Sequence, residues 1–567
     1  MWYDNGLACR TLLGSPVTTF GAETMQHRRP LFGRFLPSRR ASARLAACLG
    51  FVLLVTASIL FRLPALINAD GVHSDAAVIG LQARHILAGE WSWFVWGTNY
   101  QGALDPLLTA VAFAIAGATP LTLMVVPLIG HLLLTWFVFD VLCKGLGLAS
   151  ALVATLPLVF APHAINGVAL YPPRQWCITA VFAAIWLLDG ASTSWRPTLR
   201  YAVGAALAVL TLYLDLFAVQ FVAGLGLFAL ACCFDGGARG VVLRRAVACV
   251  LGTAISCLLV LRLYQLAPQD APWSQTARIS LAQVRYNAGP FWHDGLPWVL
   301  SSKVYVPGPR SVDLSLWVAP AGLRMIQVVG ATSFMVGLLS GGAMLFMRRV
   351  PWGVRRLGGL GFVIAVSSIA GFLMSPAAWV AGPWGARYLA PIIWAAPLAL
   401  APVAYLLRTK RFAATLAMYL VAAGVAGWIG FGPYVRGPLP VRAQHGAAQQ
   451  EAQLAAFLRQ RGITYAAAEY WLAYRLTFLW AEQPVVIPLM PVDGDRYRPY
   501  QRGFDAASDV ALIFHPYAPH APAAAYARRL EWYGVRYERR QLGEFTVFIL
   551  HKQPCAYLPP LGRPPSC

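Results

Sequence analysis

The stretch YAVGAALAVLTLYLDLFAVQFVAGLGLFALACCF, residues 201–234, decides how this chain folds. It is mostly apolar, its one charged residue is Asp215 near the middle, and basic residues flank it on both sides. As one helix it would run about 51 Å at about 1.5 Å per residue, too long for a hydrocarbon core of about 30 Å. Because both ends are basic, the segment must return to the side that it left. We therefore predict a hairpin of two short membrane spans with Asp215 at the turn.

The composition of the whole chain indicates a membrane protein. Of its 567 residues, 58% are hydrophobic and 12% are charged, against roughly 25% charged in a soluble domain. We expect a polytopic α-helical membrane protein of about 11 spans with a small C-terminal α/β soluble domain. The expected spans are 45–67, 120–143, 148–166, 176–190, 201–214, 216–234, 246–264, 322–347, 357–375, 388–407 and 412–432.

Clusters of basic residues between the spans set the expected orientation. They all fall on one side: Arg39, Arg40, Arg44, Lys144, Arg196, Arg200, Arg239, Arg244, Arg245, Arg348, Arg349, Arg355, Arg356, Arg408, Lys410 and Arg411. The positive-inside rule makes that side cytoplasmic. The net charge of +22 then reflects topology, and no basic face for nucleic acid is evident. The Arg-rich residues 1–44 are expected to be a cytoplasmic tail, with Met25 as an alternative start. Residues 433–567 are expected on the periplasmic or other extracytoplasmic side.

The outer face is expected to carry loops 68–119, 167–175, 265–321 and 376–387 and the C-terminal domain. Segment 104–117 is short for a span and fits a juxtamembrane helix. After residue 433 strands and helices alternate, which suggests a small α/β domain. Its helices are QQEAQLAAFLRQRG, ending at Gly462, and YWLAYRLTFLWAE; its strands are ITYAAAEY, PVVIPL, DVALIFHP and the pair in YERRQLGEFTVFIL. In its tail, Cys555 and Cys567 can form a disulfide if they lie outside the reducing compartment.

Acidic side chains are scarce in the membrane body, yet the first outer loop holds four: Asp70, Asp75, Glu90 and Asp105. Ionisable groups close to the hydrocarbon layer are hypotheses for function. Asp75, in GVHSDAAVIGLQARHILAGEW, has His73 and Ser74 beside it to orient a carboxylate, although an aspartate there can also cap a helix. Asp105, before a proline, is either a helix cap or a second carboxylate facing the same cavity. Asp70 and Glu90 fit an ordinary wet loop.

Basic residues on the expected outer face complement these acids. Arg387, in GPWGARYLAP, sits where the positive-inside rule disfavours it, and so do Arg174 in YPPRQW and Lys303 and Arg310 in KVYVPGPR. Cations at this rim suit a phosphate or pyrophosphate group. The alternative for Arg387 is an interfacial anchor whose charge reaches the headgroups. We expect Arg387, Lys303 and Arg174 to bind phosphate.

The motifs in the first loop and the late span resemble those of a known family. HSDAAVIGLQARHILAGEW, followed by GTNYQGALDPLL, looks like the first outer loop of the GT-C superfamily of polyprenyl-phosphate-sugar glycosyltransferases. The likeness is to the bacterial family 39 type, which is related to protein O-mannosyltransferases and to the lipid A aminoarabinose transferase. GARYLAP and EYWLAYRLTFLWAEQPVVI resemble a recurrent arginine-bearing segment and the outer soluble domain of such proteins. The resemblance covers roughly residues 45–550.

The resemblance implies transfer of a sugar, with inversion, from a polyprenyl-phosphate carrier to a lipid, glycan or protein acceptor at the outer face of the membrane. It places the catalytic base at Asp75 and a second acid at Asp105. We also expect His73, Tyr100 and Tyr388 to support the site. Ala76 stands where the family often has a second acid. This favours a single-base mechanism over a metal held by an acid pair, and a divalent metal stays an alternative.

Two other functions are compatible with parts of the sequence. A transporter or flippase for a lipid-linked glycan would place charges deep in its spans and carry an internal repeat, whereas here the acids lie in loops and no repeat is visible. A non-catalytic membrane scaffold would bind through its C-terminal domain and would not need Asp75. The chain has no P-loop, dinucleotide-binding fingerprint, HExxH or GxSxG motif, so nothing supports a nucleotide-driven pump.

Overall fold

The computed structural model describes the chain with gaps. The described residues are 39–190, 196–235, 238–268, 280–300, 304–307, 314–317, 321–375, 382–430, 435–436, 439–440, 445–489, 495–516 and 522–552. The chain divides into two units, Met1–Cys48 and Leu49–Cys567. The first unit is described only from residue 39, where helix α1 (Arg39–Ile67) begins, and the architecture below is that of the second. Most of the expected tail, Lys303, Arg310, Cys555 and Cys567 lie outside the described residues.

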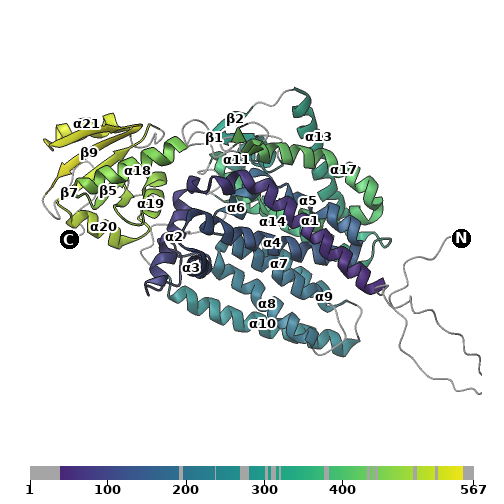
Figure 1. The fold of residues 1–567 in the computed structure, drawn as a ribbon. Coiled ribbons are helices and arrows are strands. Elements are labelled where there is room, and N and C mark those ends of the chain that lie inside the picture. Colours follow the sequence, from purple (N-terminus) through teal and green to yellow (C-terminus); the bar gives the residue numbers. More distant parts are fainter. Residues whose placement is uncertain are drawn as a thin grey trace, which may run out of the picture. The chain divides into compact units, whose positions relative to one another are not determined.

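Helices make up the described chain before residue 300. After α1 they are η2 (Ala69–Gly71), α2 (Ser74–Leu87), α3 (Leu104–Ala116), α4 (Pro120–Leu146), α5 (Leu148–Val159), α6 (His163–Leu170), α7 (Gln175–Asp189), α8 (Arg196–Leu214), η3 (Leu216–Ala218), α9 (Val219–Cys233), α10 (Arg239–Gln265), α11 (Leu281–Pro290), η4 (Phe291–Gly295) and α12 (Leu296–Val299). The chain breaks at Asp215 between α8 and α9, as the sequence predicts. Figure 1 shows α4, α7, α8 and α10 side by side, each in contact with the next.

The second half of the membrane body begins with a short strand pair. Strands β1 (Val304–Pro307) and β2 (Leu314–Trp317) run antiparallel, with Val304 opposite Trp317. There follow α13 (Ala321–Ala343), η5 (Met344–Phe346), α14 (Trp352–Met374), η6 (Gly382–Leu389), α16 (Pro391–Ala399) and α17 (Ala401–Gly430). The backbone of Arg408 is not helical, so α17 consists of two helices that meet there. This is where we expect one span to end and the next to begin.

The C-terminal part of the chain forms a mixed sheet with helices. Its elements are the antiparallel pair β3 (Val435–Arg436) and β4 (Leu439–Pro440), then α18 (His445–Gln460), β5 (Tyr465–Ala468), α19 (Tyr470–Leu479), β6 (Val485–Pro488), α20 (Arg498–Ala506), β7 (Asp509–Phe514), α21 (Ala523–Trp532), β8 (Tyr537–Leu542) and β9 (Phe545–His551). The strand order is β6-β5-β7-β9-β8; β5 is parallel to β6 and β7, and β9 is antiparallel to β7 and β8. The predicted α/β domain is confirmed, and α20 and α21 add to the elements predicted from the sequence.

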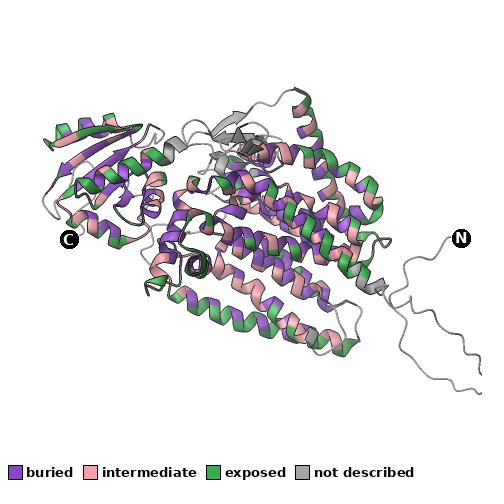
Figure 2. Ribbon diagram, viewed as in Figure 1, coloured by how far each residue is buried: buried purple, intermediate pink, exposed green. Residues whose placement is uncertain are grey.

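The described helices have the lengths and surfaces of membrane spans. Seven of them are long and apolar enough to cross a membrane: Arg44–Ile67, Pro120–Leu146, Leu216–Cys233, Arg239–Gln265, Ala321–Phe346, Trp352–Met374 and Ala401–Trp428. Shorter apolar helices include α5, α7 and most of α8. On α10 the exposed side chains are largely leucine, isoleucine and valine, and Figure 2 shows this helix exposed along much of its length, in contrast to α4 and α7. So much exposed apolar surface fits a lipid environment. The polytopic helical fold is therefore confirmed.

One expected span is interrupted. The prediction of a single helix over 148–166 is wrong, because α5 ends at Val159 and α6 begins at His163. The buried Arg62 guanidinium of α1 donates to the carbonyl oxygens of Leu158 (3.2 Å) and Val159 (3.2 Å). These carbonyls end α5 without an intrahelical partner, so the arginine satisfies the break.

The first outer loop packs against the C-terminal domain. Helix α2 is in contact with α3 and α19, and its side chains from Ala76 to Ala83 are buried. A Cβ atom on Gly80 would lie 2.6 Å from the Phe478 ring, which shows how closely α2 and α19 approach. Apolar side chains of α2 and α19 belong to one hydrophobic cluster that also includes residues of β6, β7 and β9. This packing fixes Asp75 at the junction of the membrane body and the sheet domain.

Candidate functional site

Asp75 lies in the first turn of α2, where its own helix leaves its carboxylate free for other contacts. His73 is the N-cap, and its Nδ1 atom accepts a hydrogen bond from the Ala76 amide (3.3 Å). The alternative that Asp75 caps this helix is therefore wrong. The neighbouring Ser74 hydroxyl donates to the backbone oxygen of Tyr470 (2.6 Å). Asp75 thus stands on a helix terminus that is fixed to α19.

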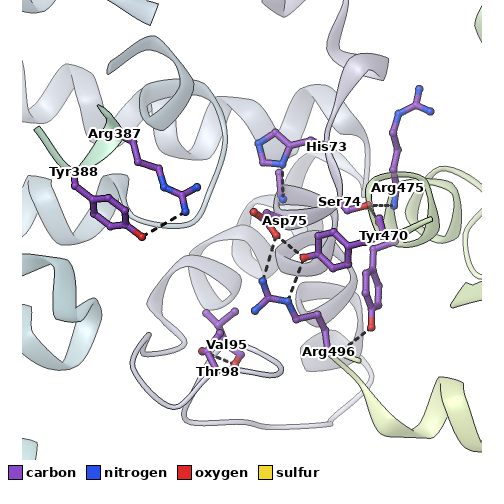
Figure 3. A network of polar contacts seen from close by, with 12 residues as sticks. His73, Ser74, Asp75, Val95, Thr98, Arg387, Tyr388, Tyr470, Arg475 and Arg496 are labelled. Atoms are coloured by element: carbon purple, nitrogen blue, oxygen red, sulfur yellow. Dashed lines mark hydrogen bonds and ion pairs between the residues drawn. The ribbon is translucent and has the colours of Figure 1, made fainter. Parts of the chain in front are cut away.

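Two side chains of the C-terminal domain bind the Asp75 carboxylate (Figure 3). The Tyr470 hydroxyl donates to Asp75 Oδ1 (2.5 Å), and Arg496 Nη2 forms an ion pair with the same oxygen (3.3 Å). Arg496 Nε also donates to the Tyr470 hydroxyl (3.2 Å). The Asp75 side chain keeps 30% of its surface exposed. The carboxylate is therefore paired and still open to a ligand.

The electrostatic surroundings of Asp75 favour its ionised form. Burial alone would raise its pKa, but the charge of Arg496, His73, the Tyr470 hydrogen bond and Arg387 together hold the pKa below the usual aspartate value. The pKa of His73 is lowered by burial and by Arg387, against the opposite effect of Asp75. A neutral imidazole agrees with a His73 Nδ1 atom that accepts a hydrogen bond. Asp75 is thus an anion among groups that carry or share positive charge.

Arg387 and Tyr388 approach this acid from η6. The Arg387 side chain is exposed, and its guanidinium contacts the Tyr388 hydroxyl (3.5 Å) and lies 5.3 Å from that ring. Its charge acts on both His73 and Asp75. In Figure 3 the Arg387 and Tyr388 side chains extend from their helix toward the side of Asp75. An exposed guanidinium is suited to bind an anion.

Arg174 is placed differently from the free cation that the sequence suggests. Its Nε atom forms an ion pair with Asp215 Oδ2 (2.9 Å), and its guanidinium lies 4.4 Å from the Phe217 ring. Asp215 is buried and also accepts from Gln101 Nε2 (3.0 Å) and from the Phe217 amide (2.8 Å). Asp215, at the turn between α8 and α9, therefore neutralises the charge of Arg174. This pairing weakens the case for Arg174 as a phosphate ligand.

Asp105 belongs to the Arg174 group and not to the Asp75 contacts. Helix α3 begins at Leu104 with Ala103 as its N-cap, so the alternative that Asp105 caps it is wrong. The carboxyl is buried, and its Oδ1 atom has no hydrogen-bond partner among the described residues. Burial raises the pKa of Asp105 to about 7, against a hydrogen bond from the Arg174 backbone. Near neutral pH it is therefore protonated in part of the molecules, unlike Asp75.

Two tyrosines each lie near several of these charged groups. Tyr100 lies within the electrostatic reach of Arg496 as well as of Arg174 and Asp215. Tyr388 lies near Arg387 and Arg174, with its ring 6.4 Å from Phe217. The structure thus brings together most of the residues that the sequence singles out, namely His73, Asp75, Tyr100, Asp105, Arg174, Arg387 and Tyr388. Their roles stay predictions.

The donor set around Asp75 fits an anion better than a metal ion. Within the described residues no group of three or more His, Cys, Asp or Glu side chains is arranged to hold a metal. Arg496 contacts Asp75, and the charge of Arg387 acts on it, so a divalent cation there would meet two guanidinium groups. Guanidinium groups are suited to bind the oxygens of a phosphate.

Sequence reasoning missed Tyr470 and Arg496. Tyr470 lies in the recognised stretch EYWLAYRLTFLWAE, but nothing in its spacing distinguishes it from a core aromatic residue. Arg496 stands in DGDRYRPY, which resembles an ordinary polar loop before a helix. Both contacts to Asp75 join residues about four hundred positions apart, with separations of 395 and 421. Only the folded chain shows such pairs.

Comparisons with known proteins find similarity in structure alone. No family model and no curated protein matches the sequence. The chain is similar to ArnT from Cupriavidus metallidurans bound to undecaprenyl phosphate, with 11% identity, a TM-score of 0.45 and coverage of 93% of this chain and 100% of that one. It is also similar to an Archaeoglobus fulgidus oligosaccharyltransferase with bound zinc and sulfate (13% identity, TM-score 0.44, 88% and 72% covered). A third is the arabinofuranosyltransferase AftD from Mycobacteria (12%, TM-score 0.46, 91% and 40%). At these values the likeness concerns the arrangement of helices and not the chemistry.

Proposed function

We propose that this protein is a membrane glycosyltransferase that moves a sugar from a polyprenyl-phosphate-linked donor to an acceptor hydroxyl at the outer face of the membrane. One observation carries the proposal. An ionised, partly exposed carboxylate, Asp75, stands beside one guanidinium, that of Arg496, and within the electrostatic reach of a second, that of Arg387. Two of these residues lie in the GT-C-like motifs of the sequence: Asp75 in the first loop and Arg387 in η6.

Asp75 acts as the general base in the proposed reaction. Direct inversion requires the acceptor hydroxyl to lose its proton as its oxygen attacks the anomeric carbon, and a carboxylate within hydrogen-bond reach accepts that proton. The departing group is a phosphate on a lipid, whose negative charge grows as the glycosidic bond breaks. The exposed guanidinium of Arg387 stabilises that charge. The apolar helices around the site keep the lipid carrier at the same depth.

Replacement of Asp75 tests this function. We expect Asp75→Asn, purified with the full chain, to lower turnover of a polyprenyl-phosphate-sugar donor by a factor on the order of 10² to 10⁴. Asp70→Asn serves as the matched control, since Asp70 is an acid in the same loop, and its turnover should stay near that of the wild type. Turnover of Asp75→Asn close to the wild-type value would refute the assignment of the base.

One observation speaks for a transporter instead. Arg62 is fully buried among the spanning helices, and a charge at that depth is a feature of transport pathways. Its guanidinium, however, donates to Ser58 Oγ (2.7 Å) and to two carbonyl oxygens at the end of α5. These contacts give the arginine a structural role, so we prefer the enzyme. A liposome assay of lipid-linked glycan translocation separates the transporter from the enzyme. A flippase would not need this acid, so Asp75→Asn should then translocate the glycan as the wild type does.

A further inference from the structure

The C-terminal domain supplies a cation to the candidate site. Arg496 Nη2 contacts Asp75 Oδ1 across 421 positions of sequence, and its guanidinium lies 5.9 Å from the centre of the Tyr470 ring. The arginine side chain is 11% exposed. It is therefore a positioned residue and not a mobile surface arginine.

Several contacts fix the backbone that carries Arg496. The Arg496 amide donates to the Tyr474 hydroxyl (2.6 Å). On the other side lies Gly97 of the first loop, where a Cβ atom would be 2.8 Å from Arg496 Cδ and 2.9 Å from its Cα. The next residue, Tyr497, stacks on Trp96 with ring centres 4.0 Å apart. The first loop thus holds this segment of the C-terminal domain directly against α2.

This ion pair is at odds with the role of Asp75 as a base. Asp75 Oδ1 accepts from both Tyr470 and Arg496, and these contacts favour the ionised carboxylate and hold its pKa low. Such a group is a weak proton acceptor, because catalytic proton transfer improves as the pKa of the base approaches the working pH. Loss of the Arg496 contact would raise the pKa of the Asp75 carboxyl and make it a stronger proton acceptor.

We propose that Arg496 is a donor-phosphate ligand that exchanges partners: the phosphate of the lipid-linked donor takes Arg496 from Asp75, and this exchange frees the carboxylate to act as base. The inference rests on the proposed function and deepens it. A phosphate group can offer the guanidinium two non-bridging oxygens, whereas Arg496 contacts only one oxygen of the Asp75 carboxylate, so the phosphate competes well for the planar fork of Arg496. The Asp75 carboxylate therefore becomes a stronger base once the donor has bound.

The chemical step that follows is balanced. The acceptor hydroxyl gives its proton to Asp75, and the acceptor oxygen forms a bond to the anomeric carbon. The bond between that carbon and the phosphate oxygen breaks, and its electron pair stays on the phosphate. The leaving polyprenyl phosphate thus gains one negative charge, which faces Arg496 and Arg387. On its departure Arg496 returns to Asp75.

Binding measurements with undecaprenyl phosphate and with undecaprenol, the same lipid without the charge, test the exchange. The experiment requires the full-length protein in nanodiscs. Arg496→Gln should weaken binding of undecaprenyl phosphate by a factor on the order of 10 to 100 and leave undecaprenol unchanged. Arg496→Lys should fall between, because it keeps the charge and loses the fork. Arg475→Gln is the matched control: Arg475 pairs with Glu451 and the backbone of Asp70 in the same interface, so its loss should not change discrimination between the two lipids.

Asp75→Asn tests the competition itself. Removal of the carboxylate should tighten undecaprenyl phosphate binding about two- to fivefold. In the Arg496→Gln background that gain should shrink, because the competing pair no longer exists. An equal gain in both backgrounds would show that the two residues do not compete. Equal weakening of both lipids by Arg496→Gln would show that Arg496 only docks the domain.

The same data separate failure of the inference from failure of the proposed function. If the wild-type protein does not prefer undecaprenyl phosphate to undecaprenol, its proposed donor class is wrong whatever Arg496 does. If the wild type prefers the phosphate and Arg496→Gln keeps the full preference, the exchange is wrong and the proposed function stands. Inorganic phosphate serves as a further probe: it should compete with the lipid in the wild type and less so in Arg496→Gln.

Discussion

The Tyr470 hydroxyl stands between the acid and the arginine at the candidate site. It donates to Asp75 Oδ1 and accepts from Arg496 Nε, and its bond helps to lower the pKa of Asp75. Tyr470→Phe removes this bond and raises the pKa of that carboxyl. The base then becomes protonated at a higher pH, so the acidic limb of the kcat/KM profile should move upward, with activity on its low-pH side reduced about two- to tenfold. A pH–rate profile checks this, and an unmoved acidic limb would contradict it.

Gly97 allows the first loop to approach the backbone of Arg496. Its φ of 70° is unfavourable for other residues, and the added Cβ would meet Arg496 at 2.8 Å. Gly97→Ala should therefore displace Arg496 and reduce activity more than tenfold. Gly117→Ala is the control, since Gly117 has a φ of 84° and an added Cβ there would have no atom within 4 Å, so that change introduces backbone strain of about 1 kcal/mol without a clash. Equal activity of the two variants would show that contact with Arg496 is not needed.

At this scale the sequence predicts the chemistry of single residues better than their partners. Asp75 and Arg387 stand out because they are charged in places where charge is disfavoured. The pairing of Arg174 with Asp215 could not be read from the sequence, because Asp215 has a sufficient local explanation at the turn of a hairpin. Arg496 could not be found either, because its contact depends on how a distant domain docks on α2.

At the scale of helices, the junction between α5 and α6 depends on Arg62. This side chain donates to Leu158 and Val159 and contacts His131 Nε2 (3.1 Å). Arg62→Leu leaves the Val159 carbonyl oxygen without its donor, whereas the Leu158 oxygen keeps its contact with His131 Nε2 (3.1 Å), so we expect a cost of about 1–3 kcal/mol. Arg262→Leu, at an exposed arginine of α10, should change stability by less than about 0.5 kcal/mol. Thermal unfolding in detergent measures both, and equal stability of the two variants would contradict the role of Arg62.

Helix α2 is also held to the C-terminal domain by a pH-sensitive contact. His85 contacts Glu90 (2.9 Å), Glu482 (3.0 Å) and the Tyr500 hydroxyl (3.2 Å). Burial lowers the pKa of His85, but the hydrogen bonds and charges of the two glutamates outweigh it and raise the pKa. A raised histidine pKa stabilises the folded state below the usual value of about 6.5, and this contribution is lost as the pH rises through the folded value.

Domain attachment should therefore weaken on the alkaline side. We expect limited proteolysis between the membrane body and the C-terminal domain to accelerate as the pH rises from about 6 to about 9. The opposing glutamates have lowered pKa values, so they stay ionised over that range. His85→Gln should remove the pH dependence, whereas His551→Gln, which alters an exposed pair with Asp509, should keep it. Persistence of the pH effect in His85→Gln would contradict this account.

The elements themselves are largely predictable, with failures where tertiary contacts intervene. Apolar length and basic flanks predict most of the long helices, and the alternation of apolar runs predicts the strands of the C-terminal sheet. The interruption at α5 and α6 escapes prediction because a side chain from α1 satisfies the broken helix end. The helices α20 and α21 are short and polar on one face, so the hydrophobic pattern alone does not reveal them.

The molecule as a whole has a predicted orientation that rests on the distribution of its basic residues. The positive-inside rule predicts a cytoplasmic N-terminus and an external C-terminal domain. A reporter enzyme that is active only outside the cytoplasm should therefore be active when fused after residue 567, and the same reporter fused after Lys144 should be inactive. Activity in the reverse pattern would place the candidate site on the inner leaflet and overturn the proposed function.

The Asp75–Arg496 ion pair can form only after the ribosome has made both residues. The ribosome makes the two residues 421 positions apart, which at about 5–20 residues per second is an interval of roughly 20–80 s. Throughout that interval the growing chain holds its acid without the arginine. A chain whose synthesis stops before residue 496 therefore lacks this ion pair, and under the exchange proposed above it would hold the donor phosphate less tightly than the complete chain does.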